Sequence, residues 1–253
     1  MKEFSNDISL MKNSRGVWDL DISKGCVHGM QHNDKGCYGE CYAARYAKVY
    51  GYDFSKTVLR KFKDIDHVAN IRRQLYNIDM PFFRIGVTGD PSDDWGHCLK
   101  IIRLVSGIKP IVIITKHWEQ LTNTQINELS LYDVCVNTSI SALDRTDLLI
   151  NRLAQYNRLK KFCKSVLRII SCDFNTNNLR GLFYNETQNL LFDNDNILDN
   201  VLRVSLNNEL VRMNIINVKS KRFLTKDSYF SKTNNSTYTG VCDKCPDMCG
   251  INI

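Results

Sequence analysis

Two groups of three cysteines, one near each end of the sequence, are the residues best suited to bind a metal. They are Cys26, Cys37 and Cys41 in the first group and Cys242, Cys245 and Cys249 in the second. Thiolate sulfur is the typical ligand of iron–sulfur clusters and of structural zinc. The other four cysteines are scattered, and we interpret them as small buried apolar residues: Cys98, Cys135, Cys163 and Cys172.

The number of cysteines in the first group indicates what kind of metal it binds. Three thiolates can hold three irons of a [4Fe–4S] cluster and leave the fourth iron open, whereas a closed structural site normally takes a fourth protein ligand. The polar N-terminus has no apolar stretch typical of a secretion signal, so we expect a cytoplasmic protein with reduced thiols. Metal binding then explains the clustered cysteines better than disulfides do.

The order of segments around the first group resembles that of the radical S-adenosylmethionine superfamily. The three cysteines follow the first expected strand, and the group ends in Cys41-Tyr42-Ala43 at the start of an expected helix. The superfamily separates its cysteines by three residues and then two, whereas ten and then three stand here. A register that begins at Cys37 would place the third ligand on Ala44, so we prefer the register that begins at Cys26.

The resemblance implies a cofactor, a reaction and a set of binding residues. It implies that a reduced cluster binds S-adenosylmethionine, receives electrons from a donor and cleaves the cofactor to a 5′-deoxyadenosyl radical that acts on an unknown substrate. It also implies cofactor-holding roles for residues at strand ends and beside the cysteines: Tyr42, Thr88, Gly89, Asp90, Ser139 and Arg168. Asp90 followed by Pro91 is equally typical of a helix N-cap. No catalytic residue can be named.

Alternating apolar runs and helical stretches predict consecutive βα units and a parallel sheet. The six expected strands are Val17–Ser23, Phe82–Gly89, Pro110–Lys116, Tyr132–Ile140, Val166–Cys172 and Val201–Leu206. The apolar residues of Asp144–Phe162 recur every three or four positions and predict a helix, as does Cys41–Tyr50. With the resemblance, six units imply a partial (β/α)6 barrel.

The last residues form a separate cysteine-rich tail. We expect a barrel domain over residues 1–239 and a metal-binding tail over residues 240–253, which is too short to form a core of its own. The tail would bind a second iron–sulfur cluster or zinc. An early Cys-Tyr-Ala combined with late clustered cysteines is also similar to a group of bacteriophage proteins.

A second hypothesis keeps the cysteines but changes the metal and the function. Cys37, Cys41, Cys242 and Cys245 would form one four-thiolate zinc site that joins the tail to the first loop. The protein would then associate with nucleic acid in a phage or mobile element. A basic stretch interleaved with aromatic residues motivates this hypothesis: Lys219, Lys221, Arg222, Phe223, Lys226, Tyr229, Phe230 and Lys232.

Composition narrows the remaining classes. The net charge of +7 favours an anionic substrate such as a nucleotide, a nucleic acid or an acidic peptide. No phosphate-binding loop, dinucleotide fingerprint, Gly-x-Ser-x-Gly elbow or His-Glu-x-x-His is present, so kinase, dehydrogenase, esterase and zinc-protease functions lack support. No apolar run approaches the ~20 residues that would span a bilayer, so we expect no membrane partner.

Overall fold

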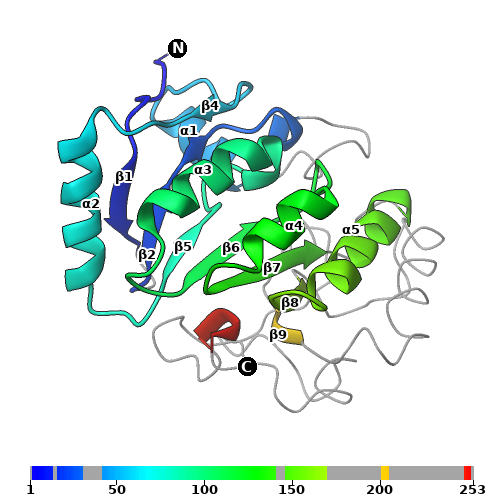
Figure 1. The fold of residues 1–253 in the computed structure, drawn as a ribbon. Coiled ribbons are helices and arrows are strands. Elements are labelled where there is room, and N and C mark those ends of the chain that lie inside the picture. Colours follow the sequence, from blue (N-terminus) through cyan, green and yellow to red (C-terminus); the bar gives the residue numbers. More distant parts are fainter. Residues whose placement is uncertain are drawn as a thin grey trace, which may run out of the picture.

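The chain forms a mixed α/β structure built on a seven-stranded sheet (Figure 1). The computed structural model describes residues 2–13, 16–30, 42–140, 146–169, 201–204 and 248–251. The strands lie side by side in the order β1 (Ser9–Lys12), β2 (Trp18–Asp21), β5 (Phe83–Ile85), β6 (Ile111–Thr115), β7 (Val134–Ile140), β8 (Lys164–Ile169) and β9 (Val201–Val204). β3 (Ser23–Lys24) and β4 (Val58–Leu59) form a separate antiparallel pair.

Each of the six predicted strands has an observed counterpart, and these six strands are parallel neighbours in chain order. The sequence did not predict the seventh strand, β1, which pairs antiparallel with β2 at the edge of the sheet. Its Ser-Leu-Met-Lys sequence is half exposed and lacks the apolar run by which the buried strands were recognised. Predicted Phe82–Gly89 ends earlier, at Ile85, because Gly86 turns the backbone with a φ of 89°.

Helices connect the parallel strands, and their ends follow local sequence signals. They are α1 (Tyr42–Val49), α2 (Ile65–Asn77), α3 (Trp95–Val105), α4 (Asn123–Leu129) and α5 (Thr146–Leu159). Asp64 and Asp94 cap α2 and α3, and Thr122 forms a capping box with Gln125 at the start of α4. The helix predicted over Asp144–Phe162 is α5, and the helix predicted over Cys41–Tyr50 is α1.

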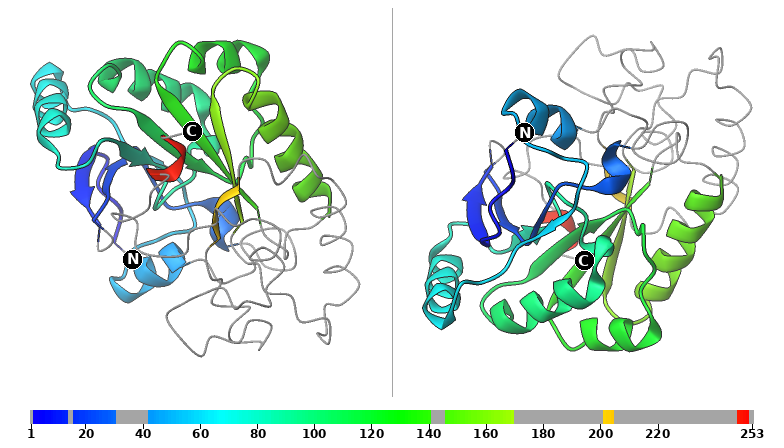
Figure 2. Two further views of the ribbon diagram at one scale, coloured as in Figure 1. Left: turned by 90° about the horizontal axis from the view of Figure 1, so that it is seen from below. Right: turned by 90° about the horizontal axis from the view of Figure 1, so that it is seen from above.

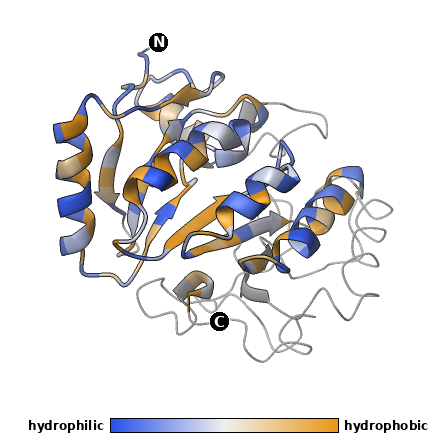
Figure 3. Cartoon of the chain, viewed as in Figure 1, coloured by the Kyte–Doolittle hydropathy of each residue, from blue (hydrophilic) through white to orange (hydrophobic). Residues whose placement is uncertain are grey.

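The two faces of the sheet are covered differently. Parallel strands in chain order with right-handed crossovers place their helices on one face, and Figure 2 shows α2–α5 along that face. The main core lies between these helices and the sheet. In Figure 3 strand β6 is mostly hydrophobic, while helices α2–α5 carry both hydrophobic and hydrophilic residues. The opposite face carries a smaller apolar cluster on which the 3₁₀ turn η5 (Met248–Gly250) packs. None of the helices that the structure describes is long and apolar enough to cross a bilayer.

Candidate functional site

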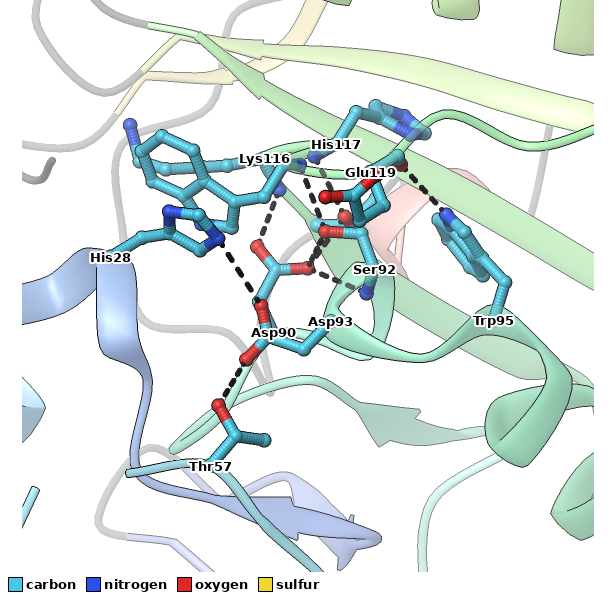
Figure 4. Close-up of polar contacts among 11 residues, drawn as sticks. His28, Thr57, Asp90, Ser92, Asp93, Trp95, Lys116, His117 and Glu119 are labelled. Carbon is cyan, nitrogen blue, oxygen red and sulfur yellow. Dashed lines mark hydrogen bonds and ion pairs between the residues drawn. The ribbon is translucent and has the colours of Figure 1, made fainter. Parts of the chain in front are cut away.

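The segments that leave β2, β5 and β6 meet at the carboxyl edge of the parallel strands, the edge where α/β folds build their active sites. They are the segment of β3 with the 3₁₀ turn η1 (Val27–Met30), the turn from Gly86 to Asp90, and residues Lys116 to Trp118. Hydrogen bonds, ring stacking and close backbone contacts join the three segments. The polar contacts among them are drawn in Figure 4.

Cys26 is buried against helix α1. The residue is only 7% exposed and packs with Ala43 and Ala47 of α1 and with Phe54. The Phe54 carbonyl accepts a hydrogen bond from the Cys26 N–H at 3.1 Å. The preceding Gly25 has a φ of 75°, and a Cβ there would lie 2.1 Å from the Lys56 carbonyl oxygen, so the turn requires glycine. Cys26 therefore lies beside the helix that begins one residue after Cys41.

The structure describes only part of the first cysteine group. Cys37 and Cys41 lie outside the described residues, and Tyr42 is described as the first residue of α1 without its side chain. Within the described ranges, no three His, Cys, Asp or Glu side chains converge as a metal would require. The prediction of a cluster on Cys26, Cys37 and Cys41 therefore stays a prediction.

The turn after β5 is built from close backbone contacts. A Cβ on Gly89 would lie 2.6 Å from the Ser23 Oγ and 2.8 Å from its carbonyl oxygen. Thr88 donates a hydrogen bond to Asp21 Oδ1 at 3.0 Å. The Ser23 hydroxyl is buried and has no hydrogen-bond partner among the residues that the structure describes. Thr88 and Gly89 are thus held against β3, next to the buried hydroxyl of Ser23.

The carboxylate of Asp90 is occupied by the chain itself. Its Oδ1 accepts hydrogen bonds from the Ser92 N–H, the Ser92 hydroxyl and the Thr115 hydroxyl at 2.7–2.9 Å, and its Oδ2 accepts one from the Lys116 N–H at 2.8 Å. Asp90 is the N-cap of the 3₁₀ turn η2 (Pro91–Asp93), with Pro91 in the first position. The N-cap interpretation of Asp90-Pro91 is confirmed, and Asp90 fastens the end of β5 to the end of β6 (Figure 4).

Charged residues line the end of the sheet next to this turn, and the sequence analysis missed them. Arg84 donates to Asp19 across β2 and β5 at 2.8 Å, and both side chains are less than 10% exposed. Asp21 pairs with Lys24 at 3.1 Å and with Arg60 at 3.6 Å. A sequence signal existed, because an arginine inside an apolar strand needs an anionic partner, and two aspartates alternate in the neighbouring strand.

Two further candidates lie on neighbouring strands. Ser139 in β7 is buried and is paired in register with Arg168 in β8, for which the structure describes the backbone alone. Two residues earlier in β7, Asn137 donates from Nδ2 to the carbonyl of Cys249 at 3.2 Å. The Oδ1 of Asn137 is buried without a hydrogen-bond partner among the described residues. Polar side chains therefore lie on β2, β5 and β7.

An aromatic and ionic stack holds the turn that follows Cys26. His28 of η1 stacks on Trp118, with ring centroids 4.5 Å apart, and the Arg152 guanidinium lies 4.6 Å from the Trp118 centroid. The His28 Nε2 also faces Asp93 Oδ1 at 3.9 Å (Figure 4). Burial, and the charge of Asp90, raise the pKa of Asp93. This stack joins η1 to the ends of β5 and β6.

Three further aromatic and histidine side chains near the site make structural contacts. His117 is buried, its Nε2 meets the Thr138 hydroxyl at 3.0 Å, and burial lowers its pKa to about 4, so the ring is neutral at pH 7. Trp95 donates to the carbonyl of Glu119 at 2.9 Å. The ring of His97 lies 3.2 Å from the Ile22 carbonyl oxygen. These contacts fix the loops around the site.

The C-terminal cysteine that the structure describes packs on the face of the sheet opposite helices α2–α5. Cys249 packs on the cluster that contains Val17 and Cys135, residues near the amino ends of β2 and β7. Its carbonyl accepts from the Cys135 thiol at 3.4 Å, and Lys164 donates to the carbonyl of Ile251 at 2.9 Å. Cys242 and Cys245, like the basic aromatic stretch from Lys219 to Lys232, lie outside the described residues.

The groups at the carboxyl edge fit the binding of S-adenosylmethionine beside a thiolate-bound cluster. A buried cysteine next to the start of a helix would supply sulfur, and a glycine turn pressed against a strand would supply backbone groups. The Ser23 hydroxyl, which has no hydrogen-bond partner among the described residues, would supply a hydrogen-bonding group.

Comparison with known proteins gives one similar fold. No family model matches the sequence, and no curated protein matches it. Among solved structures, the chain is similar to spore photoproduct lyase complexed with dinucleoside spore photoproduct, with a TM-score of 0.50 and 12% sequence identity. The similarity covers 78% of this chain and 58% of that chain, so this chain corresponds to less than two thirds of the lyase. This likeness shows that the two chains share a similar fold.

Proposed function

We propose that this protein is a radical S-adenosylmethionine-type enzyme, with a partial (β/α)6 barrel over residues 1–239 and a metal-binding tail over residues 240–253. The observation that carries the proposal is the position of Cys26. Cys26 is buried against α1, the helix that begins one residue after Cys41. It follows the first parallel strand at the carboxyl edge of the sheet, and the chain is similar in fold to such an enzyme. Loops at this edge hold the reactive groups of α/β barrels.

In this proposal Cys26, Cys37 and Cys41 bind a [4Fe–4S] cluster whose open iron takes S-adenosylmethionine. The chemistry that this pair supplies is reductive cleavage of the cofactor to a 5′-deoxyadenosyl radical, with electrons from a separate donor. The chain's own contribution is to hold the cysteine loop in place. The stack of His28 on Trp118 and the packing of Cys26 on α1 perform this task from both sides of η1.

The turn after β5 would hold the amino acid end of the cofactor. Thr88 and Gly89 would present backbone groups, and the close approach of this turn to Ser23 supports that role. Because both oxygens of Asp90 already accept hydrogen bonds within the chain, we propose that Asp90 is a positioning residue for the turn. Tyr42, Ser139 and Arg168 remain our candidates for contacts to the rest of the cofactor.

The four-cysteine zinc site stays the alternative, because Cys37, Cys41, Cys242 and Cys245 all lie outside the described residues. The described Cys249 packs on β7, where its carbonyl accepts hydrogen bonds from Cys135 and Asn137. In our proposal the tail binds a second cluster or zinc of its own.

The substrate would be of the nucleotide type. The net charge of +7 attracts anions, and the solved structure of similar fold is a complex with a dinucleoside. The electron donor remains unnamed.

The test is a metal analysis combined with a product assay on protein purified without air. We expect about four irons and four sulfides at the first site, and 5′-deoxyadenosine released after reduction with S-adenosylmethionine. Cys26→Ala, Cys37→Ala and Cys41→Ala should each lose the first cluster and the nucleoside. Cys163→Ala is the matched control, since Cys163 is a half-buried cysteine outside both groups.

The same experiment separates the two hypotheses. Zinc at one equivalent without iron or sulfide would overturn the proposal and favour the four-cysteine site. Iron that persists in all three first-group variants would indicate that the cluster is bound by the tail. Cys242→Ala and Cys245→Ala should then remove that iron.

A further inference from the structure

The face of the sheet that points away from helices α2–α5 carries the C-terminal turn η5 (Figure 2). Side chains two residues apart in a strand point to the same face of a sheet. On β7, Cys135 packs with Cys249 of η5, and Asn137 follows two residues later on the same face. Strand β6 contributes Ile114 to the same apolar cluster. We call this surface the η5 face.

Side chains of two strands bind the backbone of η5. The Cys249 carbonyl accepts hydrogen bonds from the Cys135 thiol at 3.4 Å and from the Asn137 Nδ2 at 3.2 Å. The carbonyl of Ile251 accepts a hydrogen bond from the Lys164 Nζ at 2.9 Å. Cys249 has a φ of 58°, a conformation that few residues other than glycine adopt. The bonds from β7 and β8 therefore hold η5 in one defined backbone conformation.

Contact with η5 fixes the orientation of the Asn137 amide. A backbone carbonyl oxygen can only accept hydrogen bonds, so the amide must turn its nitrogen toward Cys249. The amide oxygen Oδ1 is attached to the same planar carbon and points away from the Cys249 carbonyl. Asn137 is only 2% exposed, and its Oδ1 is buried with no hydrogen-bond partner among the described residues. Buried polar atoms without a partner are rare in folded proteins, so this acceptor calls for a donor from a ligand.

Apolar surface beside Asn137 remains open. Ile114 is the register partner of Asn137 in β6, the middle strand of the seven-stranded sheet. Ile111 and Ile113, which face the helices, are at most 1% exposed, whereas Ile114 is only partly buried. On the β5 side, Gly86 lies beside the Ile114 carbonyl and has no side chain to cover it. An apolar residue in the centre of the sheet is thus accessible next to an unpaired acceptor.

We propose that Asn137 binds the exocyclic amino group of a nucleobase that lies against Ile114 on the η5 face. The amino group donates to Oδ1, and the ring covers the accessible part of Ile114. The turn η5 occupies Nδ2 and so leaves only the acceptor of the amide for the ligand. Asn137 is therefore a specificity-determining residue, and η5 is the element that positions it.

The chemistry of these two groups selects the ligand. A nucleobase combines apolar ring faces with N–H donors on its edge, which matches one apolar residue beside one acceptor. Phosphate oxygens are acceptors and find no donor at Oδ1, so the phosphate end of a nucleotide points away from Asn137. The nucleotide type of the ligand rests on the proposed function, and Asn137 adds which end of it enters the η5 face.

The test is isothermal titration calorimetry of the full-length protein with adenosine, cytidine and guanosine. Each nucleoside is compared with the analogue that lacks only the exocyclic amino group, which is purine riboside, pyrimidin-2-one riboside or inosine. The parent protein should bind at least one amino nucleoside about 5- to 150-fold more tightly than its analogue, equivalent to about 1–3 kcal/mol for a buried acceptor left unpaired. Asn137→Leu should abolish this preference. Asn137→Ser, a smaller change, carries the same expectation if Asn137→Leu does not fold.

Two further substitutions separate the acceptor from its surroundings. Cys135→Ala is the matched control, because it removes the other hydrogen bond to the Cys249 carbonyl and leaves the Asn137 amide in place. It should keep the preference for the amino group. Ile114→Ala should weaken the binding of a nucleoside and of its analogue by the same factor. Ile150→Ala, on the exposed side of α5, should change neither.

The outcomes decide the inference independently of the enzyme proposal. A preference that persists in both Asn137 variants, equal binding of every nucleoside and its analogue, or no binding of any nucleoside would overturn it. A preference that is present in Cys26→Ala protein without iron would uphold it even if the enzyme proposal failed. Competition identifies the source of the base: displacement of the nucleoside by S-adenosylmethionine would assign Asn137 to the adenine of the cofactor, and simultaneous binding would assign it to the substrate.

Discussion

Protonation of His117 should make the protein less stable as the pH falls below 6.5. Burial lowers the pKa of this histidine from 6.5, the charge of Asp90 opposes that shift and the charge of Arg152 adds to it, and the resulting pKa is about 4. Between these two values the unfolded chain binds a proton that the folded chain does not. A group of this kind contributes its full stability above pH 6.5 and loses it as the pH falls toward 4.

The size of the effect follows from the two pKa values. Each pH unit within this window corresponds to about 1.4 kcal/mol, which limits the total effect to roughly 3 kcal/mol. Between pH 7.5 and pH 5, the free energy of unfolding should fall by roughly 2 kcal/mol on account of His117 alone. Asp93, whose pKa is raised by burial, acts in the opposite direction.

Urea unfolding at a series of pH values, followed by circular dichroism, measures this effect against a His117→Asn variant. Asparagine suits the position because the backbone at His117 has a φ of 49°, which asparagine tolerates well, and because the asparagine amide does not titrate. The parent protein should lose roughly 2 kcal/mol more than the variant between pH 7.5 and pH 5. The contribution of Asp93 is common to both proteins and cancels in the difference. Equal pH dependence of the two proteins would refute the reasoning.

Three further predictions concern the groups that shape the site. Asp19→Ala leaves the Arg84 guanidinium buried without this carboxylate and should cost about 3–5 kcal/mol of unfolding free energy. A double-mutant cycle with Arg84→Met should show strong coupling between the two residues. Additive effects of the two substitutions on unfolding free energy would argue against the ion pair. Gly86→Ala places a Cβ 2.1 Å from a carbonyl oxygen of β6 at a φ of 89°, and chemical denaturation should show a loss of at least about 1–3 kcal/mol. Thr122→Ala removes the cap of α4 and should cost about 1 kcal/mol in the same assay, without changing iron content.

The order of the strands and the main helices could be read from the sequence. Buried parallel strands are apolar on both faces, and that pattern marks each of them independently of its neighbours. For the same reason the edge strand Ser9–Lys12 was missed, since a half-exposed strand has no such run. The position of Cys26 after the first parallel strand also followed from chain order alone.

The roles of individual side chains required the tertiary structure. The sequence placed a carboxylate at Asp90, but only the approach of Thr115 and Lys116 from β6 shows that its oxygens are occupied. Likewise, the neighbouring strand decides that Arg84 pairs with Asp19. Hydrogen bonds and charge pairs join residues far apart in the chain, and their distances depend on how the strands pack.

The sequence by itself determined that this protein alternates strands and helices and carries two groups of cysteines, because periodicity and residue type are local properties. Only the tertiary structure decided that Cys249 packs beside Cys135 and Asn137 of β7 while Cys26 packs on α1. It also decided that one side of α1 is buried on Cys26 while Tyr46 and Tyr50 remain exposed. Tertiary packing determines which surfaces contact each other, and the sequence pattern of one segment does not specify which other segment packs against it.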